Sequence, residues 1–429
     1  MTEEDLRSRQ ARLQRLRAAM PRRFLRFERT PVELAAPAPP GPTPRGVSAM
    51  LPGVEVETAL GACYLLREHF AREHRHGGEA LGALAERTLA PAARLAREPR
   101  LADLTAADCA FLDTETTGLS LGAGTLVFLV GVGLLAEDGG VEVQQYFLRD
   151  PGEEPAMLAA LEETLSSKAA LVTFNGRGFD VPMLAGRYLL NRMRPRLESM
   201  PNLDLLPPAR RLWRRRIRSC ALSNLEREVL GVRRAAPDVP GWLIPQLYQD
   251  YLRTGDATEM TRVVYHNLMD VLSMVTLTSQ MCRAFEAVDE ATPALPPQDQ
   301  LSLARWYAAL NMLGEAEAAY RAALDADLPD DDLRCVYRDL AALLRRTGRR
   351  AEAVEQWAMW SVRIPGDPEP CVEIAKHLEW RAGDIAGAHR WAAAALEAAD
   401  RLPPGLGREA ARADIRHRLA RLARKMGRR

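Results

Sequence analysis

Two acidic residues one position apart form the first pattern in the sequence that could do chemistry. Asp113 and Glu115 follow the apolar run CAFL at 109–112 and precede Gly118. On a strand, residues i and i+2 face the same side, so both carboxylates would point to one place. Neighbouring carboxylates need a compensating cation or proton, and Mg²⁺ and Mn²⁺ prefer oxygen ligands. Taken alone, the pair also fits an exposed Asp-x-Glu on a half-buried strand.

Later in the chain, three more residues could act together with this pair. Asp180 lies between a predicted strand and a predicted helix, whereas His266 and Asp270 lie four residues apart in one predicted helix and therefore share a face. Taken singly, Asp180 fits a helix N-cap and His266 fits a hydrogen-bonded structural residue. Taken with the first pair, they make four carboxylates and an imidazole. Four carboxylates can neutralise two dications, and imidazole titrates near neutral pH.

The elements that must position these residues follow from hydrophobic periodicity and turn signals. After the first strand come two further strands that complete an antiparallel meander, then a helix and a crossover to a fourth strand. Another helix, a fifth strand and one long helix or a broken pair follow. The predicted strands are 125–133, 141–147, 170–174 and 202–206, and the predicted helices are 154–166, 181–192 and 256–287.

A basic segment follows the fifth strand. Residues 209–218 read ARRLWRRRIR, in which Arg210, Arg211 and Arg214 could follow a phosphate backbone while Trp213 stacks on bases or packs in the core. A helix with a solvated arginine face explains the same pattern.

The acidic motifs together resemble a known family. DTETTG at Asp113, FNGRGFDVPML at Asp180 and HNLMDVLSM at Asp270 are similar to the motifs of the DEDD exonucleases in the ribonuclease H-like superfamily. The YprB-like family is the nearer resemblance, supported by DLL and ARRLW at 204–213 and by LSNLE at 222–226. The similarity covers roughly residues 50–285.

The resemblance implies a mixed five-stranded sheet in the order 3-2-1-4-5 flanked by helices. It further implies two divalent ions, Mg²⁺ or Mn²⁺, and hydrolysis of phosphodiester bonds from the 3′ end. Asp113 would bridge both ions, Glu115 and Asp270 would hold the nucleophile-side ion, and Asp180 would act on the other. Within the same motifs, Thr116, Asn175 and Phe179 are assigned to contacts with nucleic acid.

The residue that activates water stays open. The DEDD exonucleases place Tyr four residues before the last Asp or His five before it, whereas this chain has His266 at minus four and Tyr265 at minus five. His266 is the candidate general base or water-orienting group. Asp204 is a fifth acid, for which a structural role at a strand end is expected.

A repeat appears after Gln298. Small and aromatic residues recur with a spacing of roughly 35 residues, as tetratricopeptide repeats do. Glycines 314, 348 and 383 would form the turns, and prolines 329, 365 and 403 would close the units. The pattern therefore predicts an all-α solenoid. Its concave face would bind a protein partner or only shield the nuclease domain, and the basic tail 412–429 would cap it or contact nucleic acid.

Length and composition limit the possible domain organisation and cellular compartment. A chain of 429 residues exceeds one core, so we expect a basic helix and Pro/Ala-rich linker at 1–52, a nuclease domain at 53–290 with an N-terminal extension at 53–108, and the repeats at 298–429. Six scattered cysteines, no leader and no apolar stretch of about 20 residues predict a reduced, cytoplasmic protein without a membrane span. The spacing of His69, His74 and His76 matches no zinc ligand set.

These observations predict a metal-dependent nuclease acting on a single-stranded end of DNA or RNA. Two alternatives from other classes stay open. One is a catalytically silent nucleic-acid-binding protein of the same fold, and the other is an adaptor that works through its helical repeats.

Overall fold

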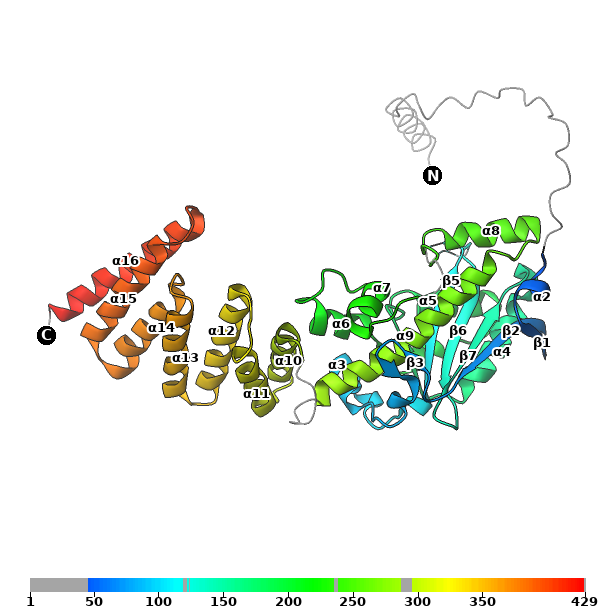
Figure 1. Cartoon of the computed structure of the whole chain (residues 1–429), viewed down its shortest axis with the longest axis horizontal. Helices are drawn as coiled ribbons and strands as arrows, with labels where there is room; N and C mark the ends of the chain where they lie inside the picture. The colour runs from blue at the N-terminus through cyan, green and yellow to red at the C-terminus, as the bar shows by residue number, and fades with distance from the viewer. Residues whose placement is uncertain (1–44, 119–121, 123, 235–237, 287–294, 428–429) are drawn as a thin grey trace, which may run out of the picture. The chain divides into compact units, whose positions relative to one another are not determined.

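The computed structural model describes residues 45–118, 122, 124–234, 238–286 and 295–427; the predicted basic helix and most of the linker after it lie outside these ranges. A seven-stranded sheet has the order β1-β2-β7-β6-β5-β8-β9, with β5, which carries the first acidic pair, in its interior (Figure 1). The strands are β1 Gly53–Thr58, β2 Gly61–Phe70, β5 Cys109–Thr116, β6 Val127–Leu135, β7 Val141–Phe147, β8 Ala170–Thr173 and β9 Asn202–Asp204. Strands β3 (Arg75–His76) and β4 (Glu79–Ala80) form a separate ribbon.

The sheet confirms the predicted order and corrects the predicted strand number. Strands β5, β6 and β7 form the antiparallel meander, and β8 and β9 run parallel to β5, which gives 3-2-1-4-5. The hairpin β1–β2 then adds two strands, because β2 pairs with the outer edge of β7 from Tyr64↔Phe147 to Phe70↔Val141. The buried residues of β2 are covered because β2 pairs with the edge of β7, and a local sequence pattern could not identify that partner strand.

Helices cover both faces of the sheet. One hydrophobic core joins it to α3 (Ala90–Ala96), α6 (Leu206–Trp213) and α9 (Met260–Glu286), and the other joins it to α4 (Glu154–Ser166), α5 (Asp180–Leu190) and α8 (Ile244–Thr254). The long helix predicted near 256–287 is one helix, α9, and it crosses β5, β6 and β7 (Figure 1).

Strand β5 divides its side chains between the two cores. Cys109 and Phe111 belong to the core under α9, whereas Ala110 and Leu112 belong to the core under α4 and α5. Because side chains alternate along a strand, the acids at 113 and 115 continue on the α9 side and Thr114 continues on the α5 side. This alternation decides which helix each site residue meets.

Two glycines of β6 let α9 approach closely. A Cβ atom on Gly131 would lie 2.2 Å from the Asn267 side-chain oxygen, and one on Gly133 would lie 2.7 Å from Val271. Only glycine leaves this space open, so β6 brings the polar face of α9 against the end of β5.

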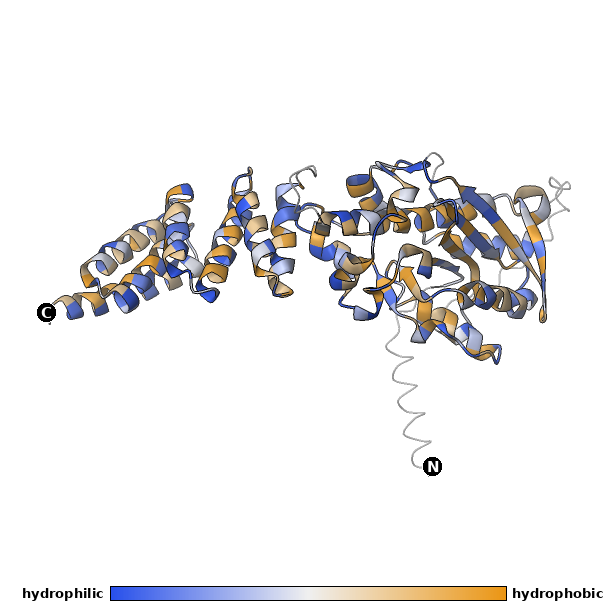
Figure 2. Ribbon diagram, turned by 90° about the horizontal axis from the view of Figure 1, so that it is seen from below, coloured by the Kyte–Doolittle hydropathy of each residue, from blue (hydrophilic) through white to orange (hydrophobic). Residues whose placement is uncertain are grey.

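All the regular secondary structure of residues 295–427 is helical. The helices are α10 Pro297–Ala309, α11 Leu313–Leu324, α12 Asp330–Arg346, α13 Arg350–Arg363, α14 Glu369–His377, the π-helical turn Leu378–Ala382, α15 Ile385–Asp400 and α16 Leu406–Met426. Hydrophobic and hydrophilic residues alternate around these helices (Figure 2). The recurring residues of the predicted repeat are all buried: Ala316, Tyr320, Ala323, Ala353, Trp357, Trp360, Ala388, Ala392 and Ala395. The all-α region is confirmed, and the tetratricopeptide assignment and the domain boundaries stay predictions.

One predicted turn is made by a different residue. Gly348 and Gly383 have positive φ angles of 83° and 68° at the ends of their helices, as expected. Gly314 instead lies inside α11, and Asn311, with φ 61°, makes the first turn. Asparagine tolerates the left-handed conformation better than most residues do, so it replaces glycine there.

The basic tail packs as a capping helix. Arg418, Arg421 and Lys425 of α16 form ion pairs with Glu379, whose side chain is fully buried. Glu379 therefore compensates one of these three positive charges within the protein. In the described parts of the chain, no helix is both long and apolar enough to cross a membrane.

Candidate nuclease site

The two acids of β5 lie under α9. Asn267, which is fully buried, donates from its side-chain nitrogen to the Asp113 carboxylate at 2.8 Å. The oxygen of the same amide accepts from Gln145 of β7, also at 2.8 Å. The Asn of the His-Asn-x-x-Asp motif therefore fixes the orientation of Asp113. Glu115 is largely enclosed as well, with 13% of its side chain exposed.

The environment opposes ionisation of both acids. Burial raises the pKa of Asp113 well above its usual range, and the carboxylates of Asp270, Glu115 and Asp180 raise it further. Burial likewise raises the pKa of Glu115, with Asp270 and Asp180 adding to the effect. The neighbouring carboxylates that raise the pKa of Asp113 and Glu115 place an excess of negative charge around these two acids, which a cation would relieve.

Asp180 approaches from the other face of the sheet. It is the first residue of α5, is 6% exposed, and accepts a hydrogen bond from the Thr114 hydroxyl. Burial raises its pKa to about 6, and the bond from Thr114 acts in the opposite direction. Its carboxylate is thus bonded to Thr114 of β5, and Phe179 is the N-cap of α5, so the N-cap interpretation does not describe Asp180.

His266 lies beside the acids and has a partner that sequence reasoning missed. Its Nδ1 atom lies 2.6 Å from the Asp238 carboxylate, while its Nε2 atom lies 3.6 Å from Asp270 and 4.0 Å from Glu115. The predicted shared face of His266 and Asp270 is therefore present. Asp238 holds one ring nitrogen, so the other is directed toward the acids.

A second residue that sequence reasoning missed, Arg234, brings a positive side chain to the acids. Arg234, with 9% of its side chain exposed, forms ion pairs with Glu226 at 2.6 Å, with Asp238 at 3.1 Å and with Asp270. The segment 231–239 has no hydrophobic period, and Arg234 lies 36 residues before Asp270. Nothing in the local sequence distinguishes this arginine from its many neighbours.

Each of the three clustered histidines has a structural contact. The His69 ring lies 3.1 Å from Asp138, His74 packs edge-on against Phe70, and His76 bonds to Ser273 at 2.8 Å. Burial lowers the pKa of His76 to about 4, so it is neutral at physiological pH. The expectation that these residues bind no zinc rested on their spacing, and each has a structural contact.

Comparison with known proteins places the chain in a family. Residues 110–282 match the RNase_H superfamily. An uncharacterized protein of Bacillus subtilis (strain 168), YprB, is 31% identical over 324 residues, which cover 74% of this chain and 76% of that protein. The chain belongs to the YprB-like family. Membership in this ribonuclease H-like family indicates a function related to nucleic acid.

The donor set of this YprB-like chain suits hard divalent cations in its chemistry. Its candidate ligands Asp113, Glu115, Asp180 and Asp270 all offer carboxylate oxygen, which Mg²⁺ and Mn²⁺ prefer. Among the described residues, no three His, Cys, Asp or Glu side chains already surround a point where an ion would fit. One of the four carboxylates, that of Asp270, instead forms an ion pair with the Arg234 guanidinium.

A hollow of about 440 Å³ opens beside the acids. Asp113, Asp270, Asn175 and Arg210 line it together with Cys220. Two of the predicted nucleic-acid contacts, Asn175 and Arg210, are therefore placed within this hollow.

The other predicted contacts are divided between structural and exposed positions. The Thr116 hydroxyl donates to the Gly118 carbonyl at 2.7 Å, and Phe179 packs against the core under α5. Arg211 lies over the Trp306 ring at 5.1 Å, and Arg214 is exposed. Trp213 is buried, so it packs in the core and does not stack on bases.

Asp204 has the structural role expected of it. Its carboxylate accepts from the backbone N–H of Asn175 at 2.8 Å and of Leu206 at 3.1 Å. Asn175 has a positive φ angle of 65°, so this turn is held in an unusual conformation at the edge of the hollow.

Proposed function

We propose that this protein is a metal-dependent nuclease that hydrolyses phosphodiester bonds at the 3′ end of a single strand of DNA or RNA. The observation that carries the proposal is the position of Asp113 and Asp270 in one hollow with Arg210, with Glu115 and Asp180 close enough that their charges help to raise the pKa of Asp113. Membership in a ribonuclease H-like family supports it.

The protein side chains would act as follows. The four carboxylates would hold two divalent ions, Mg²⁺ or Mn²⁺, which when bound supply a hydroxide nucleophile and stabilise the leaving oxygen. Asp238 fixes the His266 ring through Nδ1, so that Nε2 can take a proton from the attacking water. Arg210 would neutralise a phosphate of the bound strand.

The test is cleavage of 5′-labelled single-stranded DNA and RNA in Mg²⁺ and in Mn²⁺, with Asp113→Asn as the inactive control. A ladder that shortens from the 3′ end and disappears in the variant supports the proposal. Absence of cleavage in all four conditions, or cleavage that persists in the variant, refutes the assigned site. The preferred strand would also establish the sugar specificity.

One observation favours a second candidate. Arg234 forms an ion pair with Asp270, one of the candidate metal ligands, as a protein that binds nucleic acid without cleaving it would allow. Calorimetric titration with Mn²⁺, run beside the cleavage assay, separates the two candidates. The nuclease binds two ions per chain and cleaves the strand, whereas the silent protein binds the strand and leaves it intact.

A further inference from the structure

A second hollow, of about 490 Å³, lies where α6 packs against α10. Its wall is dominated by arginines, and no acidic side chain lines it. The six arginines, here called the arginine pocket, are Arg97, Arg210, Arg211, Arg214, Arg215 and Arg305.

Much of this positive charge is not compensated. Arg215 pairs with Asp332 and Arg305 pairs with Asp339, each at 2.5 Å. The other arginines of the pocket form no ion pair with any acid in the described ranges. Burial and the neighbouring charge of Arg97 lower the pKa of Arg211, as expected where like charges accumulate. The pocket therefore favours an anionic ligand with several charges.

One residue of the same wall carries a buried donor without a partner. Trp306 is 4% exposed, lines the pocket, and its indole N–H has no acceptor among the described residues. A buried donor without a partner costs free energy, and most such groups are satisfied in native proteins. Phosphate oxygens would supply acceptors to the arginines of the pocket.

The arginine pocket adjoins the site of the acids. Arg210 lines the pocket and also the hollow that contains Asp113 and Asp270. A nucleic acid strand carries one negative charge on each phosphate, so a strand held at the acids could continue past Arg210. An acidic peptide matches the charge of the pocket, but it gives no reason for this continuity with a phosphodiester site.

We infer that the arginine pocket binds backbone phosphates of the same single strand, several nucleotides away from the bond at the acids, so that α10 helps to hold the substrate. This inference rests on the proposed function for the position of the scissile bond. It assigns part of the helical region to nucleic acid, not to a protein partner.

The test measures strand binding by fluorescence anisotropy in an Asp113→Asn background, with labelled DNA and RNA of about 3 to 30 nucleotides. The pocket variant is Arg97→Gln with Arg214→Gln. The matched control is Arg346→Gln with Arg350→Gln, which removes two exposed arginines from a different hollow, lined by residues of α12, α13 and α14. A second pocket variant, Arg214→Gln alone, removes one exposed arginine that has no ion pair in the described ranges and should lower the salt slope by about 0.7.

We expect the first pocket variant to bind long strands about tenfold more weakly and to lower the slope of log affinity against log salt by about 1.4, since each phosphate contact contributes about 0.7 for single strands. The loss should shrink for strands too short to reach the pocket, and the control should bind like the parent protein. Both pocket variants should retain the parent's circular dichroism spectrum and melting temperature. If the first variant unfolds, the second decides the test.

Three results would overturn the inference: equal loss in the control, a loss independent of strand length, or competition by poly-glutamate as effective as that of a strand of equal charge. The two proposals fail separately. Length-dependent binding at the pocket in a protein that never cleaves would refute only the nuclease proposal. Cleavage without length-dependent loss would refute only the pocket.

Discussion

Replacing Asp180 by asparagine should stabilise the metal-free protein at neutral pH. The carboxyl is 6% exposed, and burial raises its pKa from the ordinary 3.8 to about 6. A carboxyl whose pKa is higher in the folded than in the unfolded state opposes folding once it is ionised. That penalty is absent well below pH 3.8, grows as the pH rises, and is complete above about pH 6.

The size of the effect follows from the two pKa values. Their difference corresponds to about 3 kcal/mol at pH 7.5 and to roughly half of that at pH 5. Asparagine keeps an oxygen that can accept from the Thr114 hydroxyl, so the neutral side chain does not lose this contact. We therefore expect a gain of up to about 3 kcal/mol in the free energy of unfolding, together with loss of any nuclease activity.

The assay is urea unfolding of both proteins in EDTA at pH 7.5 and at pH 5, followed by circular dichroism. Asp103→Asn, at an exposed position, is the matched control and should change the free energy by less than about 0.5 kcal/mol. A variant that is less stable than the parent at pH 7.5, or a gain of the same size at both pH values, would refute the reasoning.

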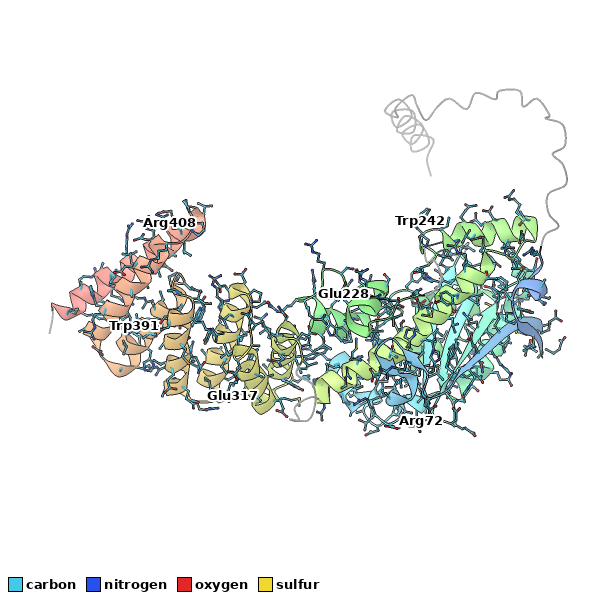
Figure 3. The ribbon with its side chains drawn as sticks, in the orientation of Figure 1. Arg72, Glu228, Trp242, Glu317, Trp391 and Arg408 are labelled. Carbon is cyan, nitrogen blue, oxygen red and sulfur yellow. The ribbon has the colours of Figure 1, made fainter. Side chains whose placement is uncertain are left out.

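Three further substitutions test the packing and charges of the site. Gly131→Ala should cost about 1 to 3 kcal/mol in urea unfolding, because the new Cβ would lie 2.2 Å from the Asn267 oxygen and α9 would have to move. Arg234→Met should cost about 3 to 5 kcal/mol, since it leaves buried carboxylates without their cation. Trp242→Ala should leave stability within about 0.5 kcal/mol of the parent but weaken strand binding by about 1 to 3 kcal/mol in anisotropy, because this 79% exposed indole beside α8 offers a surface for base stacking (Figure 3).

Each of these predictions has a control. Gly186→Ala lies within α5 with no atom near the new methyl group, so it should add about 0.5 to 1 kcal/mol where Gly131→Ala subtracts. Arg253→Met removes an exposed ion pair and should cost less than about 1 kcal/mol; a similar cost for Arg234→Met would contradict its buried role. For Trp242, phenylalanine should keep the binding that alanine loses, and equal binding by all three proteins would exclude stacking there.

Local patterns predicted the elements well where periodicity and turn chemistry acted alone. The helix at 154–166 has the predicted bounds, and the alternation of β5 placed both acids on one face. Local patterns failed where a residue or strand pairs with a partner that is distant in the sequence. Asp238 and Arg234 lie 28 and 36 residues before the side chains they hold, in a segment without period, and β2 found its place only at the edge of β7.

The hydrogen bonds through Asn267 give the site a direction as well as a position. Gln145 donates to the amide oxygen, so the amide cannot rotate by half a turn without setting donor against donor, and its nitrogen must face Asp113. One oxygen of that carboxylate is thereby occupied, and the other is left for the hollow. A side chain on β7 thus determines which lone pairs of Asp113 remain available, although β7 contributes no residue to the lining of that hollow.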